Sequence, residues 1–162
     1  MLDLETKALQ QLGAEFEPST LMFAKFYPDS TRVAYVQDRD IHVEELKNGR
    51  IRKLTSRHNE TIINGTTDWV YGEEFQIRDA FQWSPDGKFI AYLQFDTEGV
   101  GEFQLTNYLA GTYPEVMHLP YPKVGTTNSA VRIGVTSSSR ARTRWLDDLP
   151  GDPSQNYIPR FA

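Results

Sequence analysis

Apolar residues along this chain fall into short runs separated by polar turns, a pattern typical of antiparallel β-strands. Two eleven-residue segments share one pattern without a gap: 26–36 reads FYPDSTRVAYV and 83–93 reads WSPDGKFIAYL. Four aligned positions are identical, and three more keep an apolar or aromatic side chain. The chain therefore repeats one structural unit, since internal similarity of this kind is the signature of repeat architectures.

Each unit begins with an aromatic-ended strand and a tight turn, PDS at 28–30 and PDG at 85–87. Proline presets φ for such a turn, and glycine tolerates a positive φ. We predict the three strands that follow at 32–36, 41–46 and 51–54 in the first unit and at 89–95, about 102–107 and 116–119 in the second. Four short antiparallel strands in about 40–45 residues is the spacing of a β-propeller blade. An unrelated pair of hairpins in a β-sandwich is the alternative.

Two further stretches extend the pattern at either end. Residues 1–12 match 43–54 at three apolar positions, which predicts a pair of strands there. An amphipathic helix is the alternative, because leucine, alanine and leucine recur four residues apart in this stretch. Apolar residues alternate at 131–135, a polar run at 136–140 turns the chain, and 143–147 returns, which predicts part of a third blade.

These elements together predict an all-β chain, a partial β-propeller of about two to three blades with four antiparallel strands in each. Propellers close with about 4–8 blades. We therefore interpret residues 1–162 as a fragment of one propeller domain. No apolar run is long enough for a membrane helix, and the N-terminus does not resemble a signal peptide. The compartment stays open.

One connection is much longer than its counterpart. Leu12 and Phe26 are 14 residues apart, whereas Leu54 and Trp83 are 29 apart. The extra residues lie between two blades and include the run DWVYGEEF at 68–75. Loops between the strands of a rigid scaffold are where binding residues concentrate. We expect this insertion to carry the function.

Composition narrows the chemistry that the chain can perform. Hydrophobic residues make up 39%, enough for a core, and the net charge of −5 argues against nucleic acid as a partner. The absence of cysteine removes disulfides and thiolate sites. His42, His58 and His118 share no ligand spacing, and the alternation around His42 predicts an outward-facing side chain. We predict no metal site, no cofactor and no catalytic residue, since G-x-S-x-G and phosphate-loop motifs are absent.

Glu73 and Glu74 are the strongest candidates for binding chemistry. Adjacent carboxylates repel each other and favour a bound cation. A peptide α-amino group has a pKa of about 7.7–8.0 and is therefore mostly such a cation at pH 7. Both carboxylates reach one ligand only from a short or distorted turn, and Gly72 would permit a break there. The alternative is a solvated surface pair, because glutamate is ordinarily exposed.

The run 64–103 resembles the N-terminal β-propeller domain of the dipeptidyl peptidase IV family of serine exopeptidases. That family shows Asn-Gly, then Asp-Trp-Val-Tyr and a Glu-rich stretch, then Trp-Ser-Pro-(Asp/Asn)-Gly and an Ala-Tyr-x-Gln-Phe strand, and all are present here. The runs 113–115, 120–125, 143–147 and 158–160 are similar to later segments of the family. The resemblance covers most of the chain, and its most specific part is 68–74.

The resemblance implies a parent enzyme that removes dipeptides from peptide N-termini, with Pro or Ala preferred in the second position. It implies that a separate α/β-hydrolase domain, absent from this chain, carries the Ser-Asp-His triad, so that the chain alone is inactive. It implies a short helical insertion near 68–76. On this insertion Glu73 and Glu74 would bind the substrate ammonium, while Asp68, Trp69 and Tyr71 would shape and fix it. It also implies a periplasmic or membrane-associated parent and allows a homodimer.

Two departures from the family pattern leave the parent's activity open. Gly72 stands where the family often has a third glutamate, and the propeller arginine that contacts substrate in the family would lie upstream of Met1. A second interpretation is a propeller-type protein interaction module with no catalytic parent. A third is an inert truncation, which predicts an open sheet edge and self-association.

Overall fold

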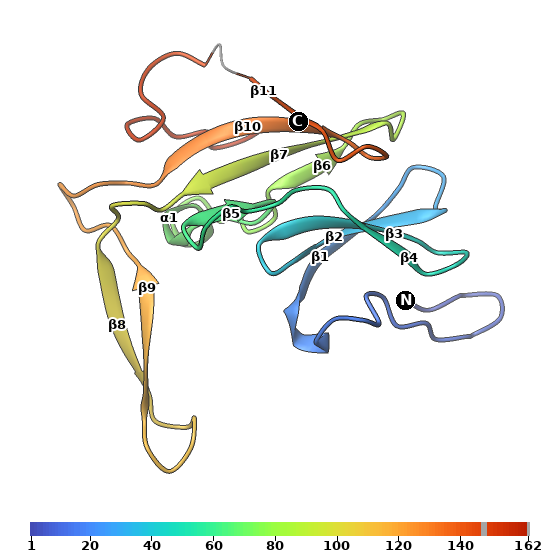
Figure 1. Cartoon of the computed structure of the whole chain (residues 1–162), viewed down its shortest axis with the longest axis horizontal. Coiled ribbons are helices and arrows are strands. Elements are labelled where there is room, and N and C mark those ends of the chain that lie inside the picture. The colour runs from blue at the N-terminus through green and yellow to red at the C-terminus, as the bar shows by residue number, and fades with distance from the viewer. Residues whose placement is uncertain (147–148, 162) are drawn as a thin grey trace.

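Two antiparallel β-sheets lie side by side, and a separate hairpin extends away from them (Figure 1). The computed structural model describes residues 1–146 and 149–161. A 3-10 turn (Pro18–Thr20) leads into the first sheet, whose strands lie in chain order: β1 (Leu21–Phe26), β2 (Arg32–Gln37), β3 (Asp40–Glu45) and β4 (Arg50–Lys53). The strands predicted for the first unit are thus confirmed as one blade.

The second sheet has the strand order β11-β10-β7-β5, with β6 also paired to β7. Its strands are β5 (Ile62–Asn64), β6 (Phe81–Trp83), β7 (Phe89–Asp96), β10 (Ala130–Ser137) and β11 (Thr143–Trp145). Asn64 of β5 lies opposite Gln94, and Phe81 of β6 lies opposite Tyr92. β5 and β6 therefore act as one edge strand that the insertion interrupts, and this sheet is the second blade.

The strands β8 (Glu102–Asn107) and β9 (Glu115–Pro120) pair with each other in a two-stranded sheet of their own. The prediction that they complete the second blade is wrong, because β10 and β11 take those places. The predicted start of a third blade is therefore wrong as well, and position 147 of it lies outside the described residues. The physical reason is that β10 pairs with β7 at eight positions and so occupies the place beside it. β8 lies away from the blade and is exposed along most of its length.

Residues 1–12 form an antiparallel turn and not the alternative helix. Leu2 bridges Leu9, and the Gln10 amide donates to the Met1 carbonyl at 2.8 Å. The predicted antiparallel pairing is confirmed, although it consists of one bridge and not of two regular strands.

Apolar side chains pack on both faces of the second blade. Between the blades lie Ala34, Val36, Ile41, Val43, Leu54, Phe81, Ile90 and Tyr92. A second cluster consists of Ile63, Tyr71, Ala80, Leu93, Phe95 and Val131. Successive side chains of β7 alternate between the two clusters, as the two-residue period of a strand requires. The second blade is therefore an inner layer, with the first blade on one side and the insertion on the other.

The outer face of the first blade is covered by the segment that precedes β1, which makes the prediction for His42 wrong. The His42 side chain is buried beside the Phe16 ring, 5.2 Å between ring centres, and burial lowers the pKa of its imidazole. On the same strand, Glu44 accepts hydrogen bonds from the Gly13 amide at 2.7 Å and the Tyr35 hydroxyl at 3.2 Å. A segment distant in the sequence thus buries a face of the first blade that would otherwise be exposed to solvent.

A row of buried polar side chains, which we call the polar chain, joins the two blades. Asp40 and Asn64 are fully buried, and the Asn64 side-chain amide donates to Asp40 Oδ1 at 2.9 Å. The Gln94 amide donates to Asn64 Oδ1 at 2.7 Å, and two guanidinium nitrogens of Arg132 donate to Gln94 Oε1 at 2.8 and 2.6 Å. Lys53 pairs with the other carboxylate oxygen of Asp40 at 2.8 Å. Because an unpaired buried polar group is costly, the polar chain fixes how the blades align.

Two glycines allow the blades to approach closely. Gly65 has φ of +76°, and a Cβ there would lie 2.6 Å from Cγ1 of Ile41 in the first blade. Gly87 has φ of +67°, and a Cβ there would overlap the ring of Tyr27. Both positions need a positive φ and the absence of a side chain, so larger residues would separate the blades.

Replacing Asn64 with alanine should destabilise the protein by about 2 kcal/mol, because Asp40 and Gln94 each lose a buried partner. Urea unfolding of the Asn64→Ala variant measures this loss. Gln82→Ala, an exposed change on β6, is the control and should shift stability by less than about 0.5 kcal/mol. Equal stability of the two variants would show that the polar chain does not couple the blades.

Candidate functional site

The insertion between β5 and β6 leaves the second blade and returns to it at one point. The Gly65 amide donates to the Leu93 carbonyl at 3.1 Å, and the Leu93 amide donates to the Ala80 carbonyl at 2.9 Å. Thr66 and Asp79 form an antiparallel bridge one residue farther out. The insertion therefore stands on a hydrogen-bonded base in the middle of the blade edge.

The helix expected near 68–76 is confirmed as α1 (Trp69–Glu73). Asp68 caps its N-terminal end, since Asp68 Oδ1 accepts a hydrogen bond from the Tyr71 amide at 3.0 Å. Carboxylate side chains are among the preferred N-caps because they satisfy amides that the first helical turn leaves unpaired. Of the three residues predicted to shape the insertion, Asp68 thus starts its helix.

The chain reverses direction directly after α1. The Ile77 amide donates to the Tyr71 carbonyl at 2.9 Å, and Gln76 has φ of +57°. Gly72 lies buried inside the helix, and a Cβ there would meet Thr67 Oγ1 at an ordinary 3.7 Å. The expectation that Gly72 breaks the helix is therefore wrong, and the distortion falls at Gln76.

Tyr71 anchors the helix to the second blade. Its side chain is 2% exposed, and its ring centre lies 4.7 Å from that of Phe95 on β7. Its hydroxyl accepts a hydrogen bond from the Ile158 amide at 2.6 Å, which ties the C-terminal segment to the insertion. Burial raises the pKa of this hydroxyl to about 12, so the group is neutral at pH 7.

Two more contacts hold the insertion in place. The Trp69 ring lies 4.1 Å from that of Tyr121, in the segment that follows the β8–β9 hairpin. At the base, Lys25 of β1 forms an ion pair with Asp79 at 2.8 Å, and its ammonium also donates to the Phe81 carbonyl. The insertion is thus fastened to both blades and to the base of the hairpin.

Glu73 and Glu74 lie together at the C-terminal end of α1, and both side chains are exposed. Glu73 Oε1 is 3.1 Å from a guanidinium nitrogen of Arg78. Within the described part of the chain, the Glu74 carboxylate forms no ion pair. The C-terminal end of a helix favours cations and not anions. The two carboxylates therefore add negative charge to a helix end that already favours cations.

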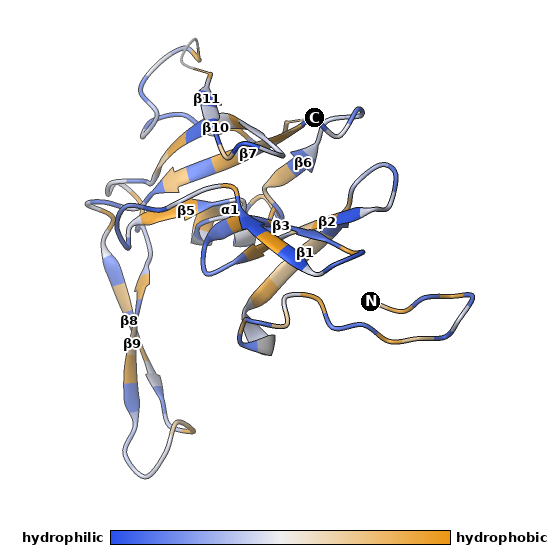
Figure 2. Cartoon of the chain, turned by 45° about the vertical axis from the view of Figure 1, so that its right-hand side comes forward, coloured by the Kyte–Doolittle hydropathy of each residue, from blue (hydrophilic) through white to orange (hydrophobic). Residues whose placement is uncertain are grey.

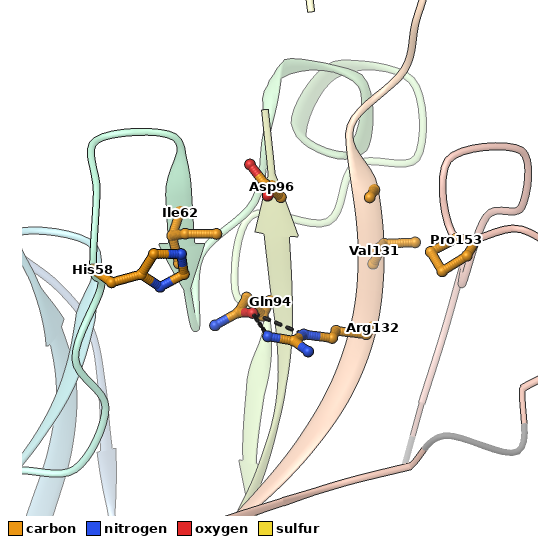
Figure 3. Close-up of a pocket in the computed structure, with 8 residues that line it drawn as sticks. His58, Ile62, Gln94, Asp96, Val131, Arg132 and Pro153 are labelled. Carbon is orange, nitrogen blue, oxygen red and sulfur yellow. Dashed lines mark hydrogen bonds between the residues drawn. The ribbon is translucent and has the colours of Figure 1, made fainter. Parts of the chain in front are cut away.

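A separate hollow of about 350 Å³ lies beside the polar chain (Figure 3). It is lined by His58, Ile62 and Asp96 and by the hydrogen-bonded pair Gln94–Arg132. Neither of the paired glutamates lines it. The hollow therefore belongs to the second blade and its neighbouring loops and not to the glutamate site.

Sequence reasoning missed three residues that complete the site. Arg78 lies five positions after Glu73, so an ion pair between the two side chains could have been predicted from the sequence. Tyr121 and Ile158 had none, because their contacts with the insertion join segments far apart in the sequence. In the described residues, no helix has the length and apolar character to cross a membrane.

Comparison with known proteins shows which family has this architecture. All of residues 1–162 match the family described as the dipeptidyl peptidase IV (DPP IV) N-terminal region. The chain is 34% identical over 138 residues to "Probable dipeptidyl peptidase 4" of Trichophyton verrucosum, covering 82% of this chain and 18% of that protein. It is 31% identical over 145 residues to "Probable dipeptidyl-aminopeptidase B" of Phaeosphaeria nodorum, covering 82% and 16%. The crystal structure of Porphyromonas gingivalis dipeptidyl peptidase 4 superposes with a TM-score of 0.78 at 33% identity, covering 86% and 20%.

Two antiparallel blades in open sheets define this chain as part of a β-propeller. With the whole of its length matched, the chain belongs to the family of dipeptidyl peptidase IV N-terminal regions. It spans about a fifth of the length of the relatives that it matches.

Removing the Asp68 cap should loosen the insertion without unfolding the blades. Asp68→Ala deletes the acceptor for the Tyr71 amide, a loss of about 1 kcal/mol, so amide exchange across 69–77 should accelerate about fivefold. Hydrogen–deuterium exchange with mass spectrometry measures it. Asp68→Asn keeps a capping oxygen and should exchange like the unmodified protein. Equal rates in the two variants would contradict the capping role.

Proposed function

We propose that this chain is the propeller part of a dipeptidyl peptidase IV-like serine exopeptidase and that Glu73 and Glu74 bind the N-terminal ammonium of its peptide substrate. The observation that carries the proposal is an exposed carboxylate pair on a short helix that the blade holds firmly. Family membership supports it. Asp68, Trp69 and Tyr71 serve this site by fixing the helix.

Arg78 is a cation that already lies beside Glu73, and a substrate ammonium would compete with it. The Glu73 and Arg78 side chains are 51% and 65% exposed, so their ion pair is screened by water and weak. A peptide ammonium offers three donors, and hydrogen bonds between charged partners are about twice as strong as neutral ones. The substrate therefore finds the Glu74 carboxylate, which has no ion-pair partner among the described residues, and the Glu73 carboxylate, which Arg78 only partly occupies.

If a rigid insertion binds the substrate ammonium, the binding determines which peptide bond of the substrate can be cleaved. Remote binding energy accelerates a reaction when it places the reacting bond correctly. If the ammonium is held at a fixed distance from a serine nucleophile, only the bond after the second residue reaches that nucleophile. We assign the nucleophile to an α/β-hydrolase domain of the full-length protein, with Pro or Ala favoured at the second substrate residue.

In the full-length protein, Glu73→Gln combined with Glu74→Gln should reduce kcat/KM for free-amine dipeptide substrates by about 100-fold, because two charge-assisted hydrogen bonds become neutral ones. Steady-state hydrolysis of a chromogenic Ala-Pro substrate measures this. Glu17→Gln with Glu98→Gln removes the same charge from exposed positions outside the insertion and should leave kcat/KM unchanged.

Two results would overturn the assignment. One is full activity of the Glu73/Glu74 double variant. The other is an equal loss in both double variants, which would indicate a general effect of charge. Near-ultraviolet circular dichroism of each variant shows whether the blades remain folded, so a folding defect is not mistaken for lost binding.

The β8–β9 hairpin favours a second candidate function, contact with another protein. Its apolar stretches lie on both strands (Figure 2). Phe103, Leu105 and Met117 share one face of the hairpin and are 44%, 41% and 49% exposed. Exposed apolar groups that gather on one surface mark interaction sites. We propose that this face pairs with a second copy of the chain in a homodimer.

The homodimer is tested by sedimentation velocity of the full-length protein. Leu105→Glu should convert a dimer into a monomer, whereas Gln104→Glu, on the opposite face of the same strand, should leave the dimer intact. A dimer that survives Leu105→Glu would contradict the assignment. An interaction module with no catalytic parent predicts the same dimer in a protein without peptidase activity.

A further inference from the structure

Three turns meet around a second cavity, which we call the basic cavity. They are the β1–β2 turn, the β6–β7 turn and the β10–β11 turn, and the open pocket between them has a volume of about 660 Å³. This volume lies within the range of about 300–1,000 Å³ that is usual for small-molecule sites. No residue of the insertion lines the basic cavity, so it is separate from the glutamate site.

The basic cavity concentrates positive charge in an acidic protein. Five of its lining residues are cationic: Arg32, Lys88, Arg140, Arg142 and Arg144. The chain as a whole carries a net charge of −5. Like charges that converge at one place repel each other. A bound anion would offset this repulsion, so the gathering of cationic residues around one pocket favours an anion there.

Carboxylates near the basic cavity are already engaged. Asp86 pairs with Lys88 at 3.2 Å and accepts a hydrogen bond from the Ser84 hydroxyl at 2.7 Å. Asp29 accepts the hydroxyl and the amide of Thr31. In the portion of the chain that the structure describes, no carboxylate lies within ion-pair distance of the four arginines of the cavity.

The turns that carry the cationic residues are fastened to one another, and Arg32 packs on an aromatic ring. The guanidinium of Arg32 lies 3.9 Å above the ring centre of Tyr27. Ser138 fastens the β10–β11 turn to the β6–β7 turn, since its hydroxyl donates to the Gly87 carbonyl and its amide to the Lys88 carbonyl, both at 3.0 Å. A ligand therefore meets arginines whose supporting turns are fixed before binding.

We propose that the basic cavity binds a small phosphate-bearing anion. Arginine presents a planar fork of donors that matches the oxygens of a phosphate in bidentate pairs. Ser137 and Ser139 add hydroxyl donors at the cavity wall, where their oxygens lie 3.3 Å apart. A phosphate monoester or diphosphate supplies the two or more negative charges that offset several guanidinium groups at once.

The test uses the full-length protein and inorganic pyrophosphate, titrated by calorimetry at pH 7.5 in 0.15 M NaCl. We expect one site with a Kd below 1 mM. Arg142→Gln with Arg144→Gln should weaken binding at least tenfold. The matched control, Lys7→Gln with Arg160→Gln, removes the same charge from exposed residues that do not line the cavity and should bind as before.

Three outcomes would overturn the proposal. The first is no heat of binding with the unmodified protein. The second is equal weakening in the two double variants, which would indicate diffuse attraction. The third is binding that disappears between 0.02 and 0.15 M NaCl, the behaviour of exposed charges without a built site. Binding of pyrophosphate supports the cavity, and glucose 6-phosphate in its place then shows whether an esterified phosphate is accepted as well as a free one. Because this cavity lies outside the insertion, the Glu73/Glu74 double variant should bind pyrophosphate normally.

Discussion

The alignment of the two blades depends on a carboxylate that has no access to water. Asp40 is fully buried at the start of β3, and it is stabilised there by Asn64, Thr55 and Lys53. Through Asn64 the polar chain continues across the second blade to Gln94. A buried charge is tolerated only with such partners. The blades therefore have one relative position in which every member of the polar chain is paired.

That position also determines where the candidate site stands. Asn64 is the last residue of β5, and the insertion begins at the next residue, Gly65. Movement between the blades would disturb the base of the insertion, since Lys25 of the first blade pairs with Asp79 at the same base. The helix that carries the glutamates is thus connected to the interior of the protein by a few short links. This arrangement suits a site that must hold a ligand at a fixed distance.

Local patterns in the sequence predicted the units that depend on neighbouring residues. The turns at 28–30 and 85–87 followed from local residue preferences, whereas the short helix near 68–76 followed from the family resemblance. Assignment of β8 and β9 to a blade failed because alternation does not specify which strand a segment pairs with. The buried state of His42 was missed for a related reason, since its cover comes from a segment 26 residues away, at Phe16. Contacts between distant segments carry no local signal.

The most direct measurement is a crystal structure of the full-length protein with a dipeptide such as Ala-Pro bound at the site. The account predicts the ligand's N-terminal nitrogen within about 2.7–3.2 Å of a carboxylate oxygen of Glu73 and of one of Glu74, the range of an N–H···O hydrogen bond. Arg78 would remain beside Glu73 or be displaced from it. A dipeptide whose ammonium contacts neither glutamate would contradict the central claim.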